Sequence, residues 1–145
     1  MISPRVLTTP MPLQMLLCLA GTIALGVGLS ILWSPTAFYA LNHIDLSGSV
    51  SLCNEVRASA GMLTASGLVM FLGVLLPRFT LTSGVLATLV FLSYGVSRLG
   101  AMAADGLPTA SLVWSAAIEL AVGLGCLWAL QHYLRATAAA DRPWE

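Results

Sequence analysis

The chain contains very little charge: charged residues make up 8% of its 145 residues, against about 25% in an ordinary soluble domain. It has no lysine, and its six arginines balance six acidic residues. A neutral chain without lysine offers no basic surface for phosphates, which excludes a nucleic-acid partner. A hydrophobic fraction of 58% and a mean hydropathy of +0.91 exclude a disordered chain. These values indicate a single integral membrane domain over residues 1–145.

The sequence also lacks the residue clusters that metal and catalytic sites require. Its three cysteines form no C-x-x-C pair, and His43 and His132 fall on opposite sides of the predicted membrane. It contains no glycine-rich phosphate loop and no nucleophile elbow. We therefore predict no metal site, no cofactor and no catalytic residue.

Long apolar stretches are abundant instead. Four of them reach the ~20 residues that a helix needs to cross ~30 Å of hydrocarbon, and each must be helical because lipid offers the backbone no hydrogen-bond partners. The first is longer than the roughly 7–15-residue apolar core of a signal peptide, so we expect it to be retained. Pro77 stops the second stretch, and the turn at Asp105–Pro108 stops the third. The sequence thus predicts an all-α, four-helix membrane bundle with spans at about 11–33, 56–76, 79–104 and 109–134.

A long connection at 34–55 joins the first two spans. Ser34 and Pro35 have the pattern of a helix N-cap followed by proline at the first helical position. Residues 35–41 therefore form either a short helix in the membrane interface or an irregular loop, and the pattern does not decide between the two. Residues 45–54 are rich in serine and glycine and are predicted to be a loop, and residues 135–145 are predicted to be a tail.

The arginine distribution predicts the orientation of the bundle. With four spans, both termini and the connection between the second and third spans share one side. That side holds Arg5, Arg78, Arg135 and Arg142. The connections on the other side contain Asp45 and Asp105 and no arginine. Both termini are therefore predicted to be cytoplasmic, with the long connection on the outer side.

Four ionisable residues lie within the spans or at their ends, where a charge is costly: roughly 2.5–3.5 kcal/mol at mid-membrane on insertion scales. They are Glu55, Arg57, Arg98 and Glu119. All four fall in the outer half of the membrane, and Glu119 is the deepest, about 15 Å along its helix at a rise of ~1.5 Å per residue. We predict that they form a neutral network between the second, third and fourth spans, in which Arg98 pairs with Glu119. The residues predicted to border this cluster are Asn54, Tyr94, Asp105 and Ser115.

Three interpretations of this cluster stay open at the level of the sequence. It is a salt-bridge network that fixes which helices are neighbours, a functional polar pocket, or a set of groups exposed to water outside the bilayer. A proton pathway is not supported, because the inner halves of the spans contain no further carboxylate or histidine.

Small residues recur every four positions on two of the spans. They are Ala20, Ala24 and Gly28 on the first, and Ala117, Ala121 and Gly125 on the fourth. Such small-xxx-small spacing permits close helix packing. It serves either packing within the bundle or self-association of two chains.

Four short segments, in their order and spacing, resemble the pattern of a family of small bacterial four-helix membrane proteins, domain of unknown function 4345. The segments are Asn54–Ala58 with Gly61, Ser97–Leu99, Asp105–Pro108 and Ile118–Leu120. The resemblance covers roughly residues 13–132. It implies four transmembrane helices in a bacterial cell (inner) membrane, and it implies no activity. It also includes the four charged residues that the cost of membrane burial selects.

We expect a non-enzymatic accessory or scaffolding subunit that packs against other membrane chains, because the chain has almost no extramembrane mass and no catalytic constellation. The alternative is a binder or carrier of a small or lipid-like ligand through the outer-leaflet polar cluster. An intramembrane enzyme or a quinone-linked redox partner is a more distant possibility. The expected partners are membrane lipids, with other membrane subunits or a second copy of the chain.

Overall fold

The computed structural model describes residues 10–140 of the chain, and every element in this range is a helix. The predicted all-α class is therefore confirmed. The topology residues Arg5 and Arg142 lie outside the described range. The elements are α1 (Met11–Trp33), α2 (Pro35–Ala40), α3 (Val50–Leu75), η1 (Pro77–Phe79), α4 (Thr80–Asp105) and α5 (Ala110–Ala140).

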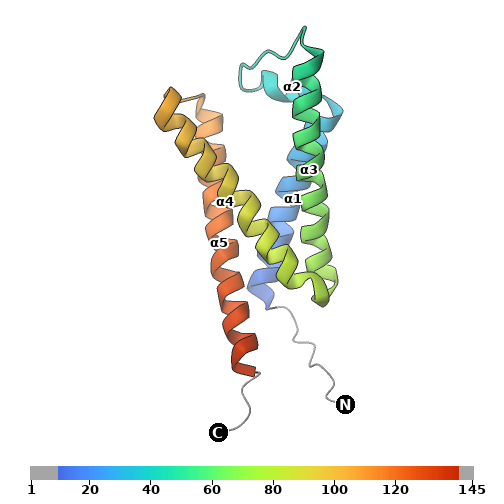
Figure 1. The fold of residues 1–145 in the computed structure, drawn as a ribbon, viewed down its shortest axis with the longest axis vertical. Coiled ribbons are helices and arrows are strands. Elements are labelled where there is room, and N and C mark those ends of the chain that lie inside the picture. The colour runs from blue at the N-terminus through green and yellow to red at the C-terminus, as the bar shows by residue number, and fades with distance from the viewer. Residues whose placement is uncertain (1–9, 141–145) are drawn as a thin grey trace.

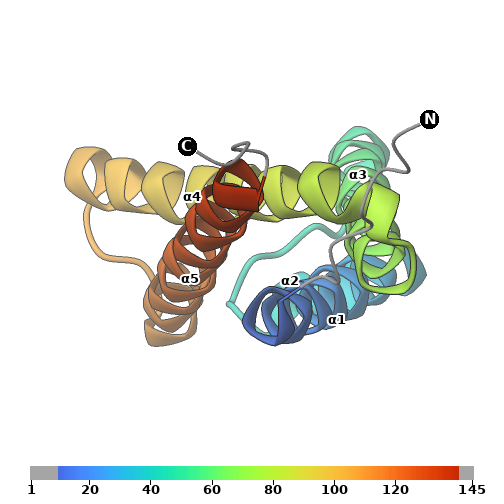
Figure 2. The same ribbon diagram turned by 90° about the horizontal axis from the view of Figure 1, so that it is seen from below.

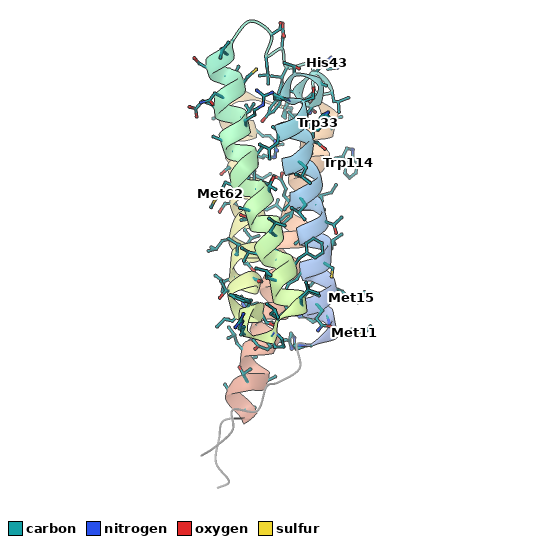
Figure 3. The ribbon with its side chains drawn as sticks, turned by 90° about the vertical axis from the view of Figure 1, so that its right-hand side faces the viewer. Met11, Met15, Trp33, His43, Met62 and Trp114 are labelled. Atoms are coloured by element: carbon teal, nitrogen blue, oxygen red, sulfur yellow. The ribbon has the colours of Figure 1, made fainter. Side chains whose placement is uncertain are left out.

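Four of these helices, α1, α3, α4 with the preceding η1 turn, and α5, are long and apolar enough to cross a membrane. The chain is a multi-pass membrane protein. Large apolar side chains project outward along all four of them, as expected where the surrounding solvent is lipid. Figure 3 shows Trp33 and Trp114 pointing away from the bundle near one end and Met11 near the other. Trp33 is 90% exposed and Trp114 is 70% exposed, as suits amphipathic rings at a membrane interface.

Local sequence signals account for most helix ends. Pro77 has no backbone N–H and ends α3, whose last backbone bond runs from Leu76 N to Leu72 O at 2.8 Å. Gly106 ends α4 at a φ of +96°, a backbone conformation that favours glycine. Residues 35–40 form the short helix α2, so the irregular-loop alternative for this segment does not apply.

Two boundaries differ from the sequence prediction. The helix α3 begins at Val50 and not near residue 56, because the Ser49 side chain caps it and accepts a hydrogen bond from the backbone N–H of Leu52 at 3.2 Å. The serine-rich loop predicted over 45–54 therefore ends at residue 49. At the other end of the chain, α5 continues to Ala140, so the predicted tail is helical over 135–140. Alanine has the highest helix propensity, which favours this extension.

The bundle consists of two helix pairs, α1 with α3 and α4 with α5 (Figure 1). Seen along the bundle in Figure 2, α4 lies across α5 and reaches α3, while α1 lies beside α3. Glycines bring the helices of each pair close together. A Cβ atom on Gly67 of α3 would lie 2.8 Å from Leu25 Cγ of α1, and one on Gly123 of α5 would lie 2.8 Å from Leu92 Cγ of α4. Any larger side chain at these positions would push the paired helices apart.

The bundle has two dissimilar halves. We call the half in which α1 begins and α5 ends the terminal half, and the half that carries α2 and the α4–α5 connection the loop half. The helices α3 and α4 are joined through η1 in the terminal half and diverge toward the loop half (Figure 1). The largest fully buried side chains all lie in the terminal half: Leu13, Leu17, Met70, Thr80, Ser83 and Cys126. The core is therefore packed most closely where α3 and α4 meet.

Candidate functional site

An ion pair between Arg98 of α4 and Glu119 of α5 lies in the loop half. Arg98 Nε lies 2.9 Å from Glu119 Oε2 and 3.1 Å from Glu119 Oε1. Arg98 stands seven residues before the end of α4, about 10 Å along its axis, and Glu119 nine residues after the start of α5, about 14 Å. Their side chains are 32% and 16% exposed. No other ion pair forms among residues 10–140.

Close packing of α4 against α5 sets the position of the pair. Gly95, one turn before Arg98, is buried against Leu120, the residue after Glu119. A Cβ atom on Gly95 would lie 2.7 Å from Leu120 Cγ, so only glycine allows this approach. The short helix separation lets the guanidinium of one helix reach the carboxylate of the other.

A cavity of about 220 Å³ lies beside the ion pair. All five α-helices contribute to its wall. The apolar lining residues are Ile23, Ala24, Val27, Ile31, Phe38, Val56, Ala60, Leu63, Val90, Phe91 and Leu112. The polar ones are Tyr39, Asn42, Ser59, Tyr94, Arg98, Ser115 and Glu119. A mostly apolar cavity with a few convergent polar groups is the usual form of a small-molecule site.

The geometry of the pair leaves hydrogen-bonding capacity unused. Arg98 contacts the carboxylate through Nε alone, and its two Nη groups have no acceptor among the described residues. A guanidinium carries five N–H donors, of which four are on the Nη groups. Each Glu119 oxygen accepts one bond from Arg98 Nε and can accept a further one. The pair can therefore both donate to and accept from a third group.

The structure does not extend the pair to the other two members of the predicted network. Arg57 Nε donates to the backbone oxygen of Leu32 on α1 at 3.4 Å. Glu55 is exposed, and its side chain makes no ion pair within the described range. Both residues are carried by α3, and α3 diverges from α4 in the loop half, which separates them from Arg98 (Figure 1).

Of the four residues predicted to border the cluster, two line the cavity and two do not. Tyr94 and Ser115 line the cavity, and Ser115 Oγ donates to the backbone oxygen of Ser111 at 3.0 Å. Asp105 shares with Arg98 a second hollow of about 250 Å³ near the end of α4. Asn54 lines a third hollow, with Arg57 and the 46–50 segment. The predicted cluster is thus divided: Arg98 lines both the cavity and the second hollow, Asn54 and Arg57 lie at the third, and Glu55 lines none of the three.

One residue that the sequence analysis did not single out joins two distant segments. Asn42, which follows α2, accepts hydrogen bonds through Oδ1 from Thr109 Oγ1 at 3.4 Å and from Ser111 Oγ at 2.5 Å. These bonds tie the α2 segment to the start of α5, and Asn42 also lines the cavity. Nothing in the local sequence pairs residue 42 with residue 109, because the contact depends on how α2 folds back over the bundle.

The connection between α2 and α3 carries a carboxylate with a perturbed pKa. The side-chain hydroxyl and the backbone N–H of Ser47 hydrogen-bond the Asp45 carboxylate, the backbone bond being 2.7 Å long, and lower the pKa of that group below its ordinary value. His43 in the same connection has a positive φ of 59°. Within residues 10–140 no group of three or more metal-binding side chains is assembled, here or elsewhere.

Comparison with known proteins adds one finding. No curated protein and no solved structure matches the chain. A family described as a domain of unknown function matches residues 12–130. This range includes the ion pair, every residue that lines the cavity, all of α3 and α4, nearly all of α1 and the first two thirds of α5. The chain therefore belongs to the family Domain of unknown function (DUF4345).

Proposed function

We propose that this membrane protein binds a small amphipathic molecule in the cavity of its loop half. The observation that carries the proposal is the Arg98–Glu119 pair, which retains unused donors and acceptors and lines a mostly apolar cavity of about 220 Å³. A ligand with one polar end and an apolar body matches both parts of this wall.

The side chains around the cavity support binding over a purely structural role for the pair. A salt bridge that only fastened α4 to α5 would require no volume beside it. Here Ala24 and Ala60, both almost fully buried, line the cavity with small side chains. Larger side chains at these two positions would reduce the space. In the terminal half, Leu13, Leu17 and Met70 fill the core, although Ala20 and Ala87 are buried there too.

The wedge between α3 and α4 supplies an entry route in this proposal. Ser59 of α3 and Tyr94 of α4 are the exposed residues among those that line the cavity. They belong to the two helices that diverge toward the loop half (Figure 1). A ligand dissolved in the bilayer reaches the cavity by this route without crossing the aqueous phase.

We place the protein in a bacterial inner membrane with both termini in the cytoplasm, which puts the cavity in the outer leaflet. The arginine distribution supports this orientation, since Arg78 and Arg135 lie toward the terminal half whereas Asp45 and Asp105 lie in the connections of the loop half. A periplasmic reporter fused after Glu145 is expected to be inactive, and an active fusion would reverse the orientation.

An accessory role next to other membrane chains is a second candidate. Ala117 and Ala121 are exposed on α5 and offer a flat surface to a neighbouring helix. The corresponding residues of α1, Ala20, Ala24 and Gly28, are buried within this chain. Stoichiometric co-purification of another membrane chain, lost when Ala117 is replaced by Phe, would favour this role.

Mass spectrometry of molecules that co-purify with the detergent-solubilised protein tests ligand binding directly. We expect a bound small molecule that is lost from the variant Val27→Phe, which fills the cavity from α1. The matched control is Val96→Phe, an equal change at an exposed position of α4 outside the cavity. Equal retention by both variants would place any bound molecule elsewhere and would overturn the proposal.

A further inference from the structure

We infer that the ligand of this cavity is an uncharged molecule of about nine non-hydrogen atoms that carries a hydroxyl group at one end. This inference depends on the proposed function and specifies the chemical class of the ligand. It follows from the net charge of the wall, the hydrogen-bonding pattern of the pair and the size of the cavity.

The charge of the cavity wall excludes an ionic ligand. Arg98 and Glu119 neutralise each other at 2.9 Å. Among the described residues that line the cavity there is no further Asp, Glu, Lys, Arg or His, and the remaining polar groups are Tyr39, Asn42, Ser59, Tyr94 and Ser115. A carboxylate or an ammonium ion would lose its hydration on entry and find no uncompensated opposite charge.

The hydrogen-bonding pattern of the pair favours a group that both accepts and donates, and a hydroxyl is the smallest such group. Arg98 offers unused Nη–H donors, and Glu119, which bonds Arg98 Nε, offers unused acceptor sites. A hydroxyl accepts from the first and donates to the second, whereas a carbonyl group accepts only. A hydrocarbon would leave the Nη–H donors of Arg98 and the remaining acceptor sites of Glu119 unpaired in the cavity.

The volume of the cavity limits how much of a ligand it can enclose. A protein cavity of ~150 Å³ holds benzene, with its six carbon atoms. In proportion, a cavity of about 220 Å³ holds about nine non-hydrogen atoms. A phospholipid or a long fatty chain would leave most of its atoms outside this volume, so the ligand that the cavity can enclose is a compact alcohol or phenol whose body packs on side chains such as Val27, Val90 and Phe91.

Four probes of one shape test the inference with the full chain in detergent: cyclohexylmethanol, methylcyclohexane, cyclohexanecarboxylate and cyclohexylmethylammonium. Equilibrium dialysis against matched empty micelles gives the excess of each probe bound per protein. We expect the alcohol to bind about ten-fold more tightly than the hydrocarbon, because only the alcohol forms hydrogen bonds to the two charged groups, and one such bond is enough for a difference of this size. Both ionic probes are expected to bind at least about ten-fold more weakly than the alcohol.

Two variants connect the binding to the site. The double variant Arg98→Met with Glu119→Leu removes both charges together, and it should lower the affinity for the alcohol to that for the hydrocarbon. Val27→Phe should abolish binding of both neutral probes, and Val96→Phe should not. Val90→Phe fills the cavity from α4 and replaces Val27→Phe if that variant fails to give monodisperse protein.

The outcomes separate the two proposals. Tightest binding of the carboxylate or of the ammonium probe would overturn the ligand class while supporting a ligand site, as would equal binding of alcohol and hydrocarbon. A co-purified molecule much larger than nine non-hydrogen atoms, lost in Val27→Phe, would overturn the size. Absence of any binding that Val27→Phe removes would overturn the proposed function itself.

Discussion

The terminal half and the loop half of the bundle are built from the same four long helices, but their side chains are packed differently. In the terminal half, Leu13, Leu17, Met70 and Cys126 are fully buried. Even its polar groups bond internally, as when Ser83 Oγ of α4 donates to the backbone oxygen of Val69 on α3 at 2.6 Å. Most of the core that α1, α3, α4 and α5 share lies in this half, and Ala24 and Phe91 extend it to the wall of the cavity.

In the loop half the same helices enclose a cavity and an ion pair. The helix α4 remains packed on α5 but diverges from α3, and small residues such as Ala60 line the space between the pairs. The difference shows that an apolar sequence does not pack uniformly along its length. The largest fully buried side chains are concentrated at one end of the bundle, and the polar groups and the cavity lie at the other.

The largest effect is expected from a change that opens the terminal half. A side chain at Gly73 of α3 would collide with Ser83 of α4 and press on Leu17 of α1. We expect Gly73→Leu to lower the free energy of unfolding by about 3 kcal/mol or more, as severe overpacking does. The measurement is denaturant unfolding in mixed micelles, followed by circular dichroism.

Gly100→Leu is the matched control for that variant. Gly100 also lies within a long helix, but a Cβ atom there meets nothing within 4 Å. The control should be neutral or slightly stabilising, because leucine favours a helix more than glycine does. Equal destabilisation by both variants would contradict the close packing of the terminal half.

A smaller effect is expected when the ion pair is broken in the loop half. Arg98→Met leaves Glu119 without its partner in the membrane, and we expect a loss of about 2 kcal/mol, below the ~3–5 kcal/mol of a fully buried pair. The second change Glu119→Gln should restore most of this loss, since no charge then remains unpaired. A double-mutant cycle in mixed micelles measures the coupling. A coupling energy of zero would show that the two groups do not interact in the membrane.

Loss of the Asn42 contacts should have a more modest effect. Asn42→Ala removes two hydrogen bonds that tie the α2 segment to α5, and we expect a loss of about 1 kcal/mol. Because these bonds hold only the α2 segment against α5, the backbone amides of residues 35–49 should exchange faster, while those of the terminal half should exchange at an unchanged rate. Faster exchange spread evenly over both halves would contradict a local role.

The smallest effect is expected at the charged residues of α3. Arg57→Met removes one long hydrogen bond to Leu32, and Glu55→Gln removes no contact among the described residues. We expect each to change the free energy of unfolding by no more than about 0.5 kcal/mol. A loss of unfolding free energy in Arg57→Met as large as that in Arg98→Met would instead support the four-membered network predicted from the sequence.

Much of the fold was predictable because the cost of exposing backbone and charge to lipid acts locally. The length of each apolar stretch predicted a helix, and Pro77 and Gly106 marked two of the helix ends. The start of α3 at Val50 was missed although Ser49 carries an N-cap signal, because the serine and glycine content of residues 45–54 favoured a loop. That error concerns a boundary, which a single side-chain hydrogen bond decides.

The sequence by itself determined that the chain is helical, that it crosses a membrane, and how deep Arg98 and Glu119 lie along their helices. Only the tertiary structure decided that these two residues adjoin a cavity, that Arg57 and Glu55 stand apart from them, and that Asn42 contacts Thr109 and Ser111. The physical reason is that depth depends on position along one helix, whereas pairing depends on the angle between helices. Close glycine contacts and the short η1 turn set that angle, and no pattern within a single span records it.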